Sequence, residues 1–189
     1  MPSAMAYIGH ASFASRLKMD VLEAIRNRRS IRKYKDTEVE DKKLQEILEA
    51  GRWAPSASNR QPWQFIVVRD KALRENLAEA HTYGRFMKES PVVIVVIGEP
   101  ARHPRYNLAD PHNAVQNMLL AAYAQGLSTC WMGVRDTDIE PVFRRLLNVP
   151  DDLRVVCSIS VGYGDQERTS TRRSLDEIVS WETFGGKRS

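Results

Sequence analysis

Residues 54–68 read APSASNRQPWQFIVV, and they join the end of an amphipathic helix to a strand. The junction consists of small polar residues, a proline-fixed turn and a tryptophan, and an apolar run follows it. Its hydroxyl and amide groups are suited to hydrogen-bond the edge of a flat heteroaromatic ligand. An ordinary turn is the alternative interpretation, because Pro, Ser and Asn are common turn residues.

Two helices are expected before this junction. MDVLEAIRNRRSIRKY, from Met19, places apolar residues at helical spacing and offers Asp20 as a cap. The next segment, residues 36–55, carries an apolar stripe and predicts a helix that ends near Gly51, because the chain must leave the helix before Pro55.

Strands alternate with helices after the junction. Strands are expected at 63–70, 91–98, 128–134 and 153–164, and helices at 71–81, 113–127 and 139–150. The polar, proline-containing loop 101–112 is the segment expected to be most mobile, and 174–185 is expected to form a helical or extended tail. Most strands lack apolar–polar alternation, so both faces of a central sheet should be covered. The order of elements indicates one α/β or α+β domain.

The composition is that of an ordinary globular protein, with 42% hydrophobic and 28% charged residues in 189. We expect one domain over 19–189, preceded by a flexible or vector-derived extension over 1–18 that lacks the features of a signal peptide. The net charge of +4 is spread along the chain, which does not favour nucleic-acid binding. The apolar runs are too short to span a membrane. Cys130 and Cys157 lie in apolar surroundings, which indicates buried free thiols and a reducing cytoplasm.

Two arginine clusters suggest a phosphate site. Arg28, Arg29, Ser30 and Arg32 lie at a helix end, where the planar guanidinium groups suit bidentate phosphate contacts. Arg172 and Arg173 form a second cluster after the last strand. A solvated basic surface is the alternative in both cases.

A further candidate site is the end of the third expected strand, at Trp131, Met132 and Gly133. A glycine beside large apolar residues lets the backbone approach a ligand closely. A core strand that ends in a turn explains the same residues equally well.

Several common chemistries find no support in the sequence. The histidines do not fall at metal-ligand spacing, and no metal ligand or catalytic side chain is predicted. The sequence has no GxSxG elbow, no GxxxxGK loop and no GxGxxG fingerprint. A cofactor would therefore carry any reaction.

In this order, four motifs resemble the nitroreductase family of flavoproteins: RRSIRKY, APSASNRQPWQF, AVQNMLLAAYAQGLSTCWMG, and GYG followed by RRSLDEIV. The resemblance runs from Met19 to about Trp181. RRSxR alone is a weak signal, and APSxxNxQPW at this distance makes it specific. The resemblance implies an α+β three-layer sandwich, with a central, mainly antiparallel sheet flanked by helices, in an intertwined homodimer.

The resemblance also implies non-covalent FMN at the subunit interface. Arg28, Arg29, Ser30 and Arg32 would hold its phosphate and ribityl chain or its pyrimidine edge, and Arg173 with Arg172 would close over the phosphate. Trp131, Met132 and Gly133 would lie against the isoalloxazine. The wall facing the flavin would come from the partner subunit: Pro55, Ser56, Ala57, Ser58, Asn59 and, less directly, Gln61.

The implied activity is reduction of nitroaromatics, quinones or similar small acceptors by NAD(P)H in ping-pong fashion. The loop 99–112 would act as a lid over the acceptor. Two alternatives stay open: another flavin enzyme on the same scaffold, such as a reductive dehalogenase, and a flavin- or nucleotide-binding protein without turnover. The expected partners are a second copy and a small-molecule acceptor, with no nucleic acid and no membrane, in the cytoplasm.

Overall fold

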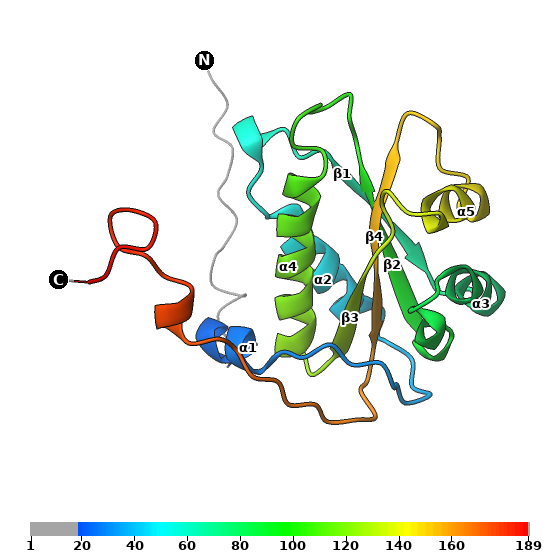
Figure 1. Cartoon of the computed structure of the whole chain (residues 1–189). Coiled ribbons are helices and arrows are strands. Elements are labelled where there is room, and N and C mark those ends of the chain that lie inside the picture. The colour runs from blue at the N-terminus through cyan, green and yellow to red at the C-terminus, as the bar shows by residue number, and fades with distance from the viewer. Residues whose placement is uncertain (1–18, 189) are drawn as a thin grey trace, which may run out of the picture.

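A four-stranded sheet forms the middle of the computed structural model, which describes residues 19–188 (Figure 1). Its spatial order is β1-β2-β4-β3, and every neighbouring pair is antiparallel. The strands are β1 (Trp63–Val68), β2 (Val92–Gly98), β3 (Ser128–Gly133) and β4 (Arg154–Gly162). The antiparallel α+β sheet expected from the sequence is confirmed. The expected extension over 1–18 lies outside the described residues.

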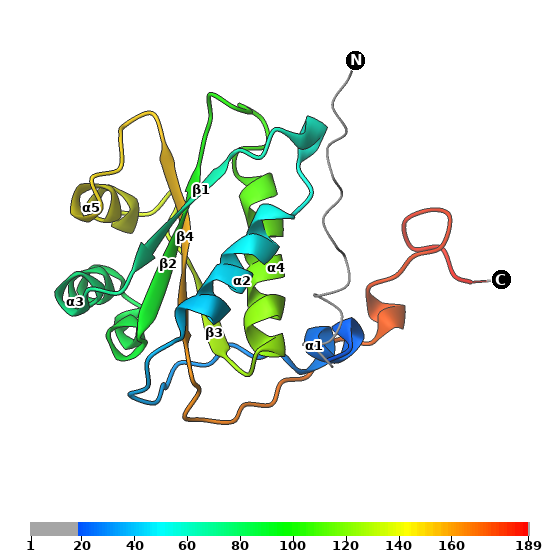
Figure 2. The ribbon, with the colours of Figure 1, turned by 180° about the vertical axis from the view of Figure 1, so that it is seen from behind.

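Helices cover both faces of this sheet, which gives three layers (Figures 1 and 2). On one face lie α2 (Asp41–Arg52) and α4 (Ala109–Ala124), and on the other lie α3 (Lys71–Ala80) and α5 (Ile139–Leu146). The short helix α1 (Val21–Asn27) packs near one end of α4. The side chain of Asp20 caps α1 as predicted, because it accepts the N–H of Leu22 at 2.8 Å.

The two apolar layers explain why β2 shows no alternation in sequence. Successive side chains of a strand point to opposite faces. Val92 and Ile94 pack with α2 and α4, whereas Val93 and Val95 pack with α3 and α5. All seven residues of β2 are buried, so each face of the strand requires apolar side chains. Cys130 and Cys157 are buried and free, as predicted.

Helix α4 begins four residues earlier than the sequence predicted. It starts at Ala109 rather than at Asn113, so the last part of the expected loop is helical. Pro111 does not prevent this, because the first turn of a helix has no use for the missing N–H. The remaining loop packs against the sheet: the side-chain amide of Asn107 donates to the carbonyls of His103 (3.1 Å) and Pro104 (2.6 Å), and Asn107 is buried.

Gly98, at the end of β2, makes this close packing possible. A Cβ atom at Gly98 would collide with the backbone oxygen of Asn107. We therefore expect Gly98→Ala to lower the free energy of unfolding by about 1–3 kcal/mol, the usual cost of overpacking. Chemical denaturation of the wild type and the variant checks this. An unchanged unfolding midpoint would contradict the packing of the loop on β2.

Candidate functional site

The segment that follows α1 lies along the outer edge of β3. Ser30 forms an isolated parallel bridge with Thr129, and the N–H of Ile31 donates to the Thr129 carbonyl at 2.9 Å. Buried Tyr34 ties this segment to β4. Its hydroxyl donates to the Ile31 carbonyl at 2.7 Å and lies 2.6 Å from the Ser160 Oγ. Burial raises the pKa of the Tyr34 phenol, so the hydroxyl keeps its proton and remains a donor.

Arginines gather beside this edge without carboxylate partners in residues 19–188. The pKa of Arg28 is lowered by burial and then by the neighbouring charges of Arg172 and Arg29. The segment after α1 and the segment after β4, far apart in sequence, thus lie side by side, as Figure 1 also shows. Within residues 19–188, no Asp or Glu forms an ion pair with Arg28, Arg29 or Arg172.

The surroundings of Cys130 on β3 reveal two further members of the cluster. Burial raises the pKa of the Cys130 thiol, and this rise is opposed by the charge of Arg32, by a hydrogen bond from Ser30 and by the charge of Arg168. Arg168 was not predicted, although a third arginine shortly before Arg172 in QERTSTRR was a usable signal. We call the following five residues the basic cluster: Arg28, Arg29, Arg32, Arg168 and Arg172.

The predicted arginines differ in how they are held. The Nη1 of Arg29 donates to the carbonyls of Arg26 (2.6 Å) and Arg28 (2.9 Å), so this guanidinium is turned toward its own backbone. The Nη1 of Arg172 donates to the Ser170 hydroxyl and to the Thr171 carbonyl. This guanidinium lies close enough to Arg28 to lower the pKa of Arg28. Arg173 is exposed and makes no hydrogen bond or ion pair with residues 19–188. The geometry therefore gives Arg172 the position nearer to Arg28.

β3 is an edge strand, and part of its outer edge has no strand partner within residues 19–188. Residues of an antiparallel strand alternately direct their N–H and C=O groups to one side and to the other. The Thr129 carbonyl points away from β4 toward Ile31, so Trp131 and Gly133 present their backbone groups on this same open side. The side chain of Trp131 is 42% exposed and lies beside His112, with 5.9 Å between the ring centroids. Met132, in contrast, is buried in the core, so only its backbone can face a ligand.

Residues 55–61, which precede β1, form a strained turn beside the start of α4. Ser58 and Asn59 have φ values of 53°, and Gln61 has a φ of 47°, within the left-handed region that non-glycine residues seldom adopt. Contacts with α4 hold the turn: the Ala57 N–H donates to Asp110 Oδ2 at 3.0 Å. Such over-determined strain clusters at functional sites, which supports the interpretation of this turn as more than a connection.

Within one chain, this turn and the basic cluster lie at opposite ends of α4. Figures 1 and 2 show the turn at the N-terminal end of α4, whereas α1 and the chain that follows it lie at the C-terminal end. With 16 residues, α4 is about 24 Å long. A ligand that contacts both sets of residues therefore needs the turn of a second chain.

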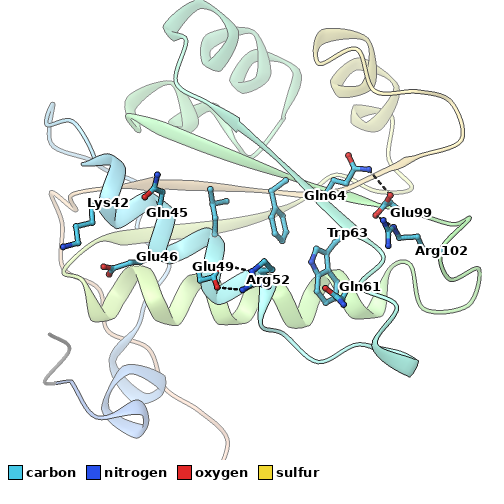
Figure 3. Close-up of a pocket in the computed structure, with 12 residues that line it drawn as sticks. Lys42, Gln45, Glu46, Glu49, Arg52, Gln61, Trp63, Gln64, Glu99 and Arg102 are labelled. Atoms are coloured by element: carbon cyan, nitrogen blue, oxygen red, sulfur yellow. Dashed lines mark hydrogen bonds and ion pairs between the residues drawn. The ribbon is translucent and has the colours of Figure 1, made fainter. Parts of the chain in front are cut away.

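A well-defined groove of the single chain lies elsewhere. Its volume is about 960 Å³, and it lies between α2 and the outer edge of β1. Figure 3 shows its lining residues, among which Gln61 is the one predicted site residue. Its floor includes Trp63 and Phe65, and its rim carries ion pairs and hydrogen bonds such as Gln64 Nε2 to Glu99 Oε1 at 2.9 Å. We place the site at the basic cluster instead, because unpaired charge and open backbone groups converge there.

Residues 19–188 contain neither a metal-binding cluster of side chains nor a membrane-spanning helix. No group of three or more His, Cys, Asp or Glu side chains is arranged to hold a metal ion there. None of the helices in that part of the chain is long and apolar enough to cross a membrane.

Comparison with known proteins identifies the family. The sequence profile of the Nitroreductase family matches residues 25–82 and 79–163. The chain belongs to the nitroreductase family. An NADH dehydrogenase of Thermus thermophilus is 44% identical over 198 residues, covering 86% of this chain and 96% of the relative.

Solved structures of nitroreductases share this fold. An FMN-dependent nitroreductase of Clostridium difficile superposes with a TM-score of 0.80 at 36% identity, covering 86% of this chain and 99% of that chain. A nitroreductase-like protein of Desulfovibrio desulfuricans, solved in complex with FMN, gives a TM-score of 0.77 at 37% identity, covering 88% and 99%. The predicted nitroreductase-like sandwich is therefore confirmed.

Proposed function

We propose that this nitroreductase is an FMN-dependent oxidoreductase that uses NAD(P)H to reduce nitroaromatics, quinones or similar small acceptors in ping-pong fashion. The observation that carries the proposal is the basic cluster beside the open edge of β3. Its arginines repel one another and lack carboxylate partners within residues 19–188, so a bound phosphate would supply the missing countercharge. The NADH dehydrogenase and FMN-dependent relatives support the same donor and cofactor.

The residues present fit FMN. Arg28, Arg172 and the Ser30 hydroxyl would hold the phosphate and ribityl chain, with Arg32 and Arg168 adding positive charge. Arg29 and Arg173 would contribute less directly. The open backbone groups and exposed indole at Trp131–Gly133 would border the ring system. When bound, FMN supplies the two-electron chemistry that connects NAD(P)H with the acceptor.

The remaining wall would come from a second copy of the chain, through residues 55–59 and, less directly, Gln61. Apolar surface supports this homodimer, because contiguous exposed apolar side chains mark protein interfaces. Helix α1 exposes three such residues, and the C-terminal tail beyond it, which runs away from the sheet in Figure 1, exposes five more. They are Val21, Leu22 and Ile25 on α1, and Leu175, Ile178, Val179, Trp181 and Phe184 on the tail.

The protein's own part in the reaction is binding, orientation and exclusion of water. The basic cluster neutralises charge, and the peptide groups of β3 offer fixed dipoles where charge develops during reduction. We assign no catalytic acid, base or nucleophile and no metal. NAD(P)H and the acceptor would use one open face in turn, bordered by the part of the expected 99–112 lid that precedes α4, residues 99–108. With two buried thiols, we place the protein in a reducing cytoplasm, with no nucleic-acid or membrane partner.

Anaerobic titration tests this function. Purified protein with one FMN per chain should lose its visible flavin absorbance on addition of NADH or NADPH, and regain it with a nitroaromatic or quinone. Protein that binds no FMN would contradict the proposal. Bound FMN that neither nicotinamide reduces would favour the binding-protein alternative, and reoxidation by halophenols alone would favour the dehalogenase.

A further inference from the structure

A buried histidine closes one end of the open edge of β3. His81 follows α3 and is 5% exposed, and its Nε2 lies 3.0 Å from the carbonyl oxygen of Gly133. The two residues are 52 positions apart in sequence. At the other end of the same edge, the N–H of Ile31 donates to the Thr129 carbonyl. His81 and Ile31 thus bracket the backbone of Trp131 and Gly133, where the open groups lie.

The hydrogen bonds of His81 fix its tautomer. The N–H of Tyr83 donates to His81 Nδ1 at 3.3 Å, so Nδ1 must carry a lone pair. The Gly133 carbonyl can only accept, so Nε2 must carry the proton. In this arrangement Nε2 donates to Gly133 and Nδ1 accepts from Tyr83, so neither ring nitrogen is left for proton transfer.

The surrounding residues hold the ring in this orientation. A Cβ atom at Gly84 would lie 2.8 Å from His81 Cγ, so the turn after α3 closes directly on the imidazole. The Gly84 N–H donates to the His81 carbonyl at 2.9 Å. On another side, Phe143 meets the ring edge-on, with centroids 6.4 Å apart. A ring clamped in this way can fix the peptide to which it donates.

We propose that His81 is a positioning residue for the cofactor-facing edge of β3, an inference that rests on the proposed function. Its Nε2–H occupies the Gly133 carbonyl, and the Cys130 thiol donates to the Trp131 carbonyl at 3.7 Å, so the N–H groups of Trp131 and Gly133 are the polar groups of this edge without a partner in residues 19–188. Without this donor, an unpaired carbonyl oxygen would lie beside a cofactor that becomes more negative on reduction. His81 acts through Gly133 and does not itself contact the reacting atoms.

The test compares three variants with the wild type. His81→Leu removes the donor, and His81→Gln keeps an amide N–H with comparable reach. Val68→Ala removes buried methyl groups from the core on the α3 and α5 face of the sheet, but it lies on β1, at the opposite edge from β3 and Gly133. For each protein, the FMN dissociation constant, the flavin midpoint potential and the thermal unfolding midpoint are measured.

We expect His81→Leu to bind FMN about three- to tenfold more weakly, the effect of one lost neutral hydrogen bond. Its flavin midpoint potential should become more negative, because the free carbonyl disfavours the reduced state. His81→Gln should restore both values toward the wild type. Val68→Ala should lower the unfolding midpoint without changing the midpoint potential.

Three results would overturn the inference. The first is a His81→Leu protein with wild-type affinity and potential. The second is a His81→Gln protein as impaired as His81→Leu, which would indicate packing rather than donation. The third is a proton on Nδ1 of His81 in a long-range ¹H–¹⁵N spectrum of the FMN-free protein. Wild-type protein that binds no FMN would overturn the proposed function as well, whereas normal binding in every variant would overturn this inference alone.

Discussion

Arg28→Ala is expected to weaken FMN binding by about 1.5–3 kcal/mol, the usual value of a hydrogen bond to a charged group. This corresponds to a roughly ten- to hundredfold rise in the FMN dissociation constant. Arg28 lies at the centre of the basic cluster, where burial and the charges of Arg172 and Arg29 lower its pKa. Fluorescence titration of the FMN-free protein with FMN measures the effect.

A second charge on the same segment provides the matched control. Lys33 is exposed and forms an ion pair with Asp165 at 3.0 Å, so it already has a countercharge. Lys33→Ala removes the same formal charge and should leave FMN affinity within about twofold, because exposed pairs contribute little.

Arg28→Ala should not destabilise the fold of the FMN-free protein, although it weakens FMN binding. Because Arg28 repels Arg172 and Arg29, its removal relieves unfavourable charge when no phosphate is present. The FMN-free Arg28→Ala protein should therefore be at least as stable as the wild type. A less stable FMN-free protein with unchanged FMN affinity would mean that Arg28 supports the fold and not the cofactor.

Glu140→Ala is expected to lower the free energy of unfolding by about 1–3 kcal/mol, because it leaves the backbone N–H groups of Asp136 and Val155 without their acceptor and takes one of two carboxylate partners from the half-buried guanidinium of Arg154. Glu140 is buried at the start of α5 and accepts hydrogen bonds from Arg154 Nε at 2.8 Å and from Arg154 Nη2 at 2.9 Å. It also accepts from the N–H groups of Asp136 (3.0 Å) and Val155 (3.1 Å). These contacts hold the turn that follows Gly133, so the fold behind the site depends on them.

Asp136→Asn is the control for this prediction, because asparagine removes the charge and tolerates the φ of 57° at this position. Asp136 contacts the same guanidinium at 2.7 Å but is exposed, so its loss should cost much less than the loss of Glu140. Equal losses from the two variants, measured by denaturant unfolding, would contradict the central role of Glu140.

The contribution of Glu140 should also depend on pH. Burial raises the pKa of this carboxyl, but the hydrogen bonds from Arg154 and from backbone N–H groups outweigh it, and the net shift is downward from 4.5. A lowered folded pKa gives stability that is present above the unfolded value and is lost as pH falls through the folded value. The stability difference between wild type and Glu140→Ala should therefore shrink below about pH 4.5.

Local pattern predicted the elements of this fold well. The apolar run of β2 indicated a strand covered on both faces, and Val92 and Val93 do pack against opposite layers. The start of α4 was predicted wrongly because Pro111 was read as part of a loop, although proline is acceptable in a first helical turn.

Contacts between distant segments limited prediction of the site. Arg28 and Arg172 could be named from the sequence, but only the folded chain places them together. His81 had no local signal, because its partner Gly133 is 52 residues away and the pairing depends on the turn at Gly84. The roles of residues 55–59 toward a second copy remain a prediction.

Complementation between two defective chains tests the shared site most directly. One chain carries Arg28→Ala with Arg172→Ala. The other carries Ser58→Trp, which fills the space in front of the exposed strained turn. If each site combines the basic cluster of one chain with residues 55–59 of the other, a mixed dimer has one site with both defects and one site with neither.

Each variant alone should bind little FMN, and co-refolding the two chains in equal amounts should restore wild-type affinity in about a quarter of all sites, as expected for random pairing into twofold dimers. The measurement is the FMN bound per chain at a concentration that saturates the wild type alone. A co-refolded mixture that forms mixed dimers but binds no more FMN than the average of the separate variants would contradict the shared site.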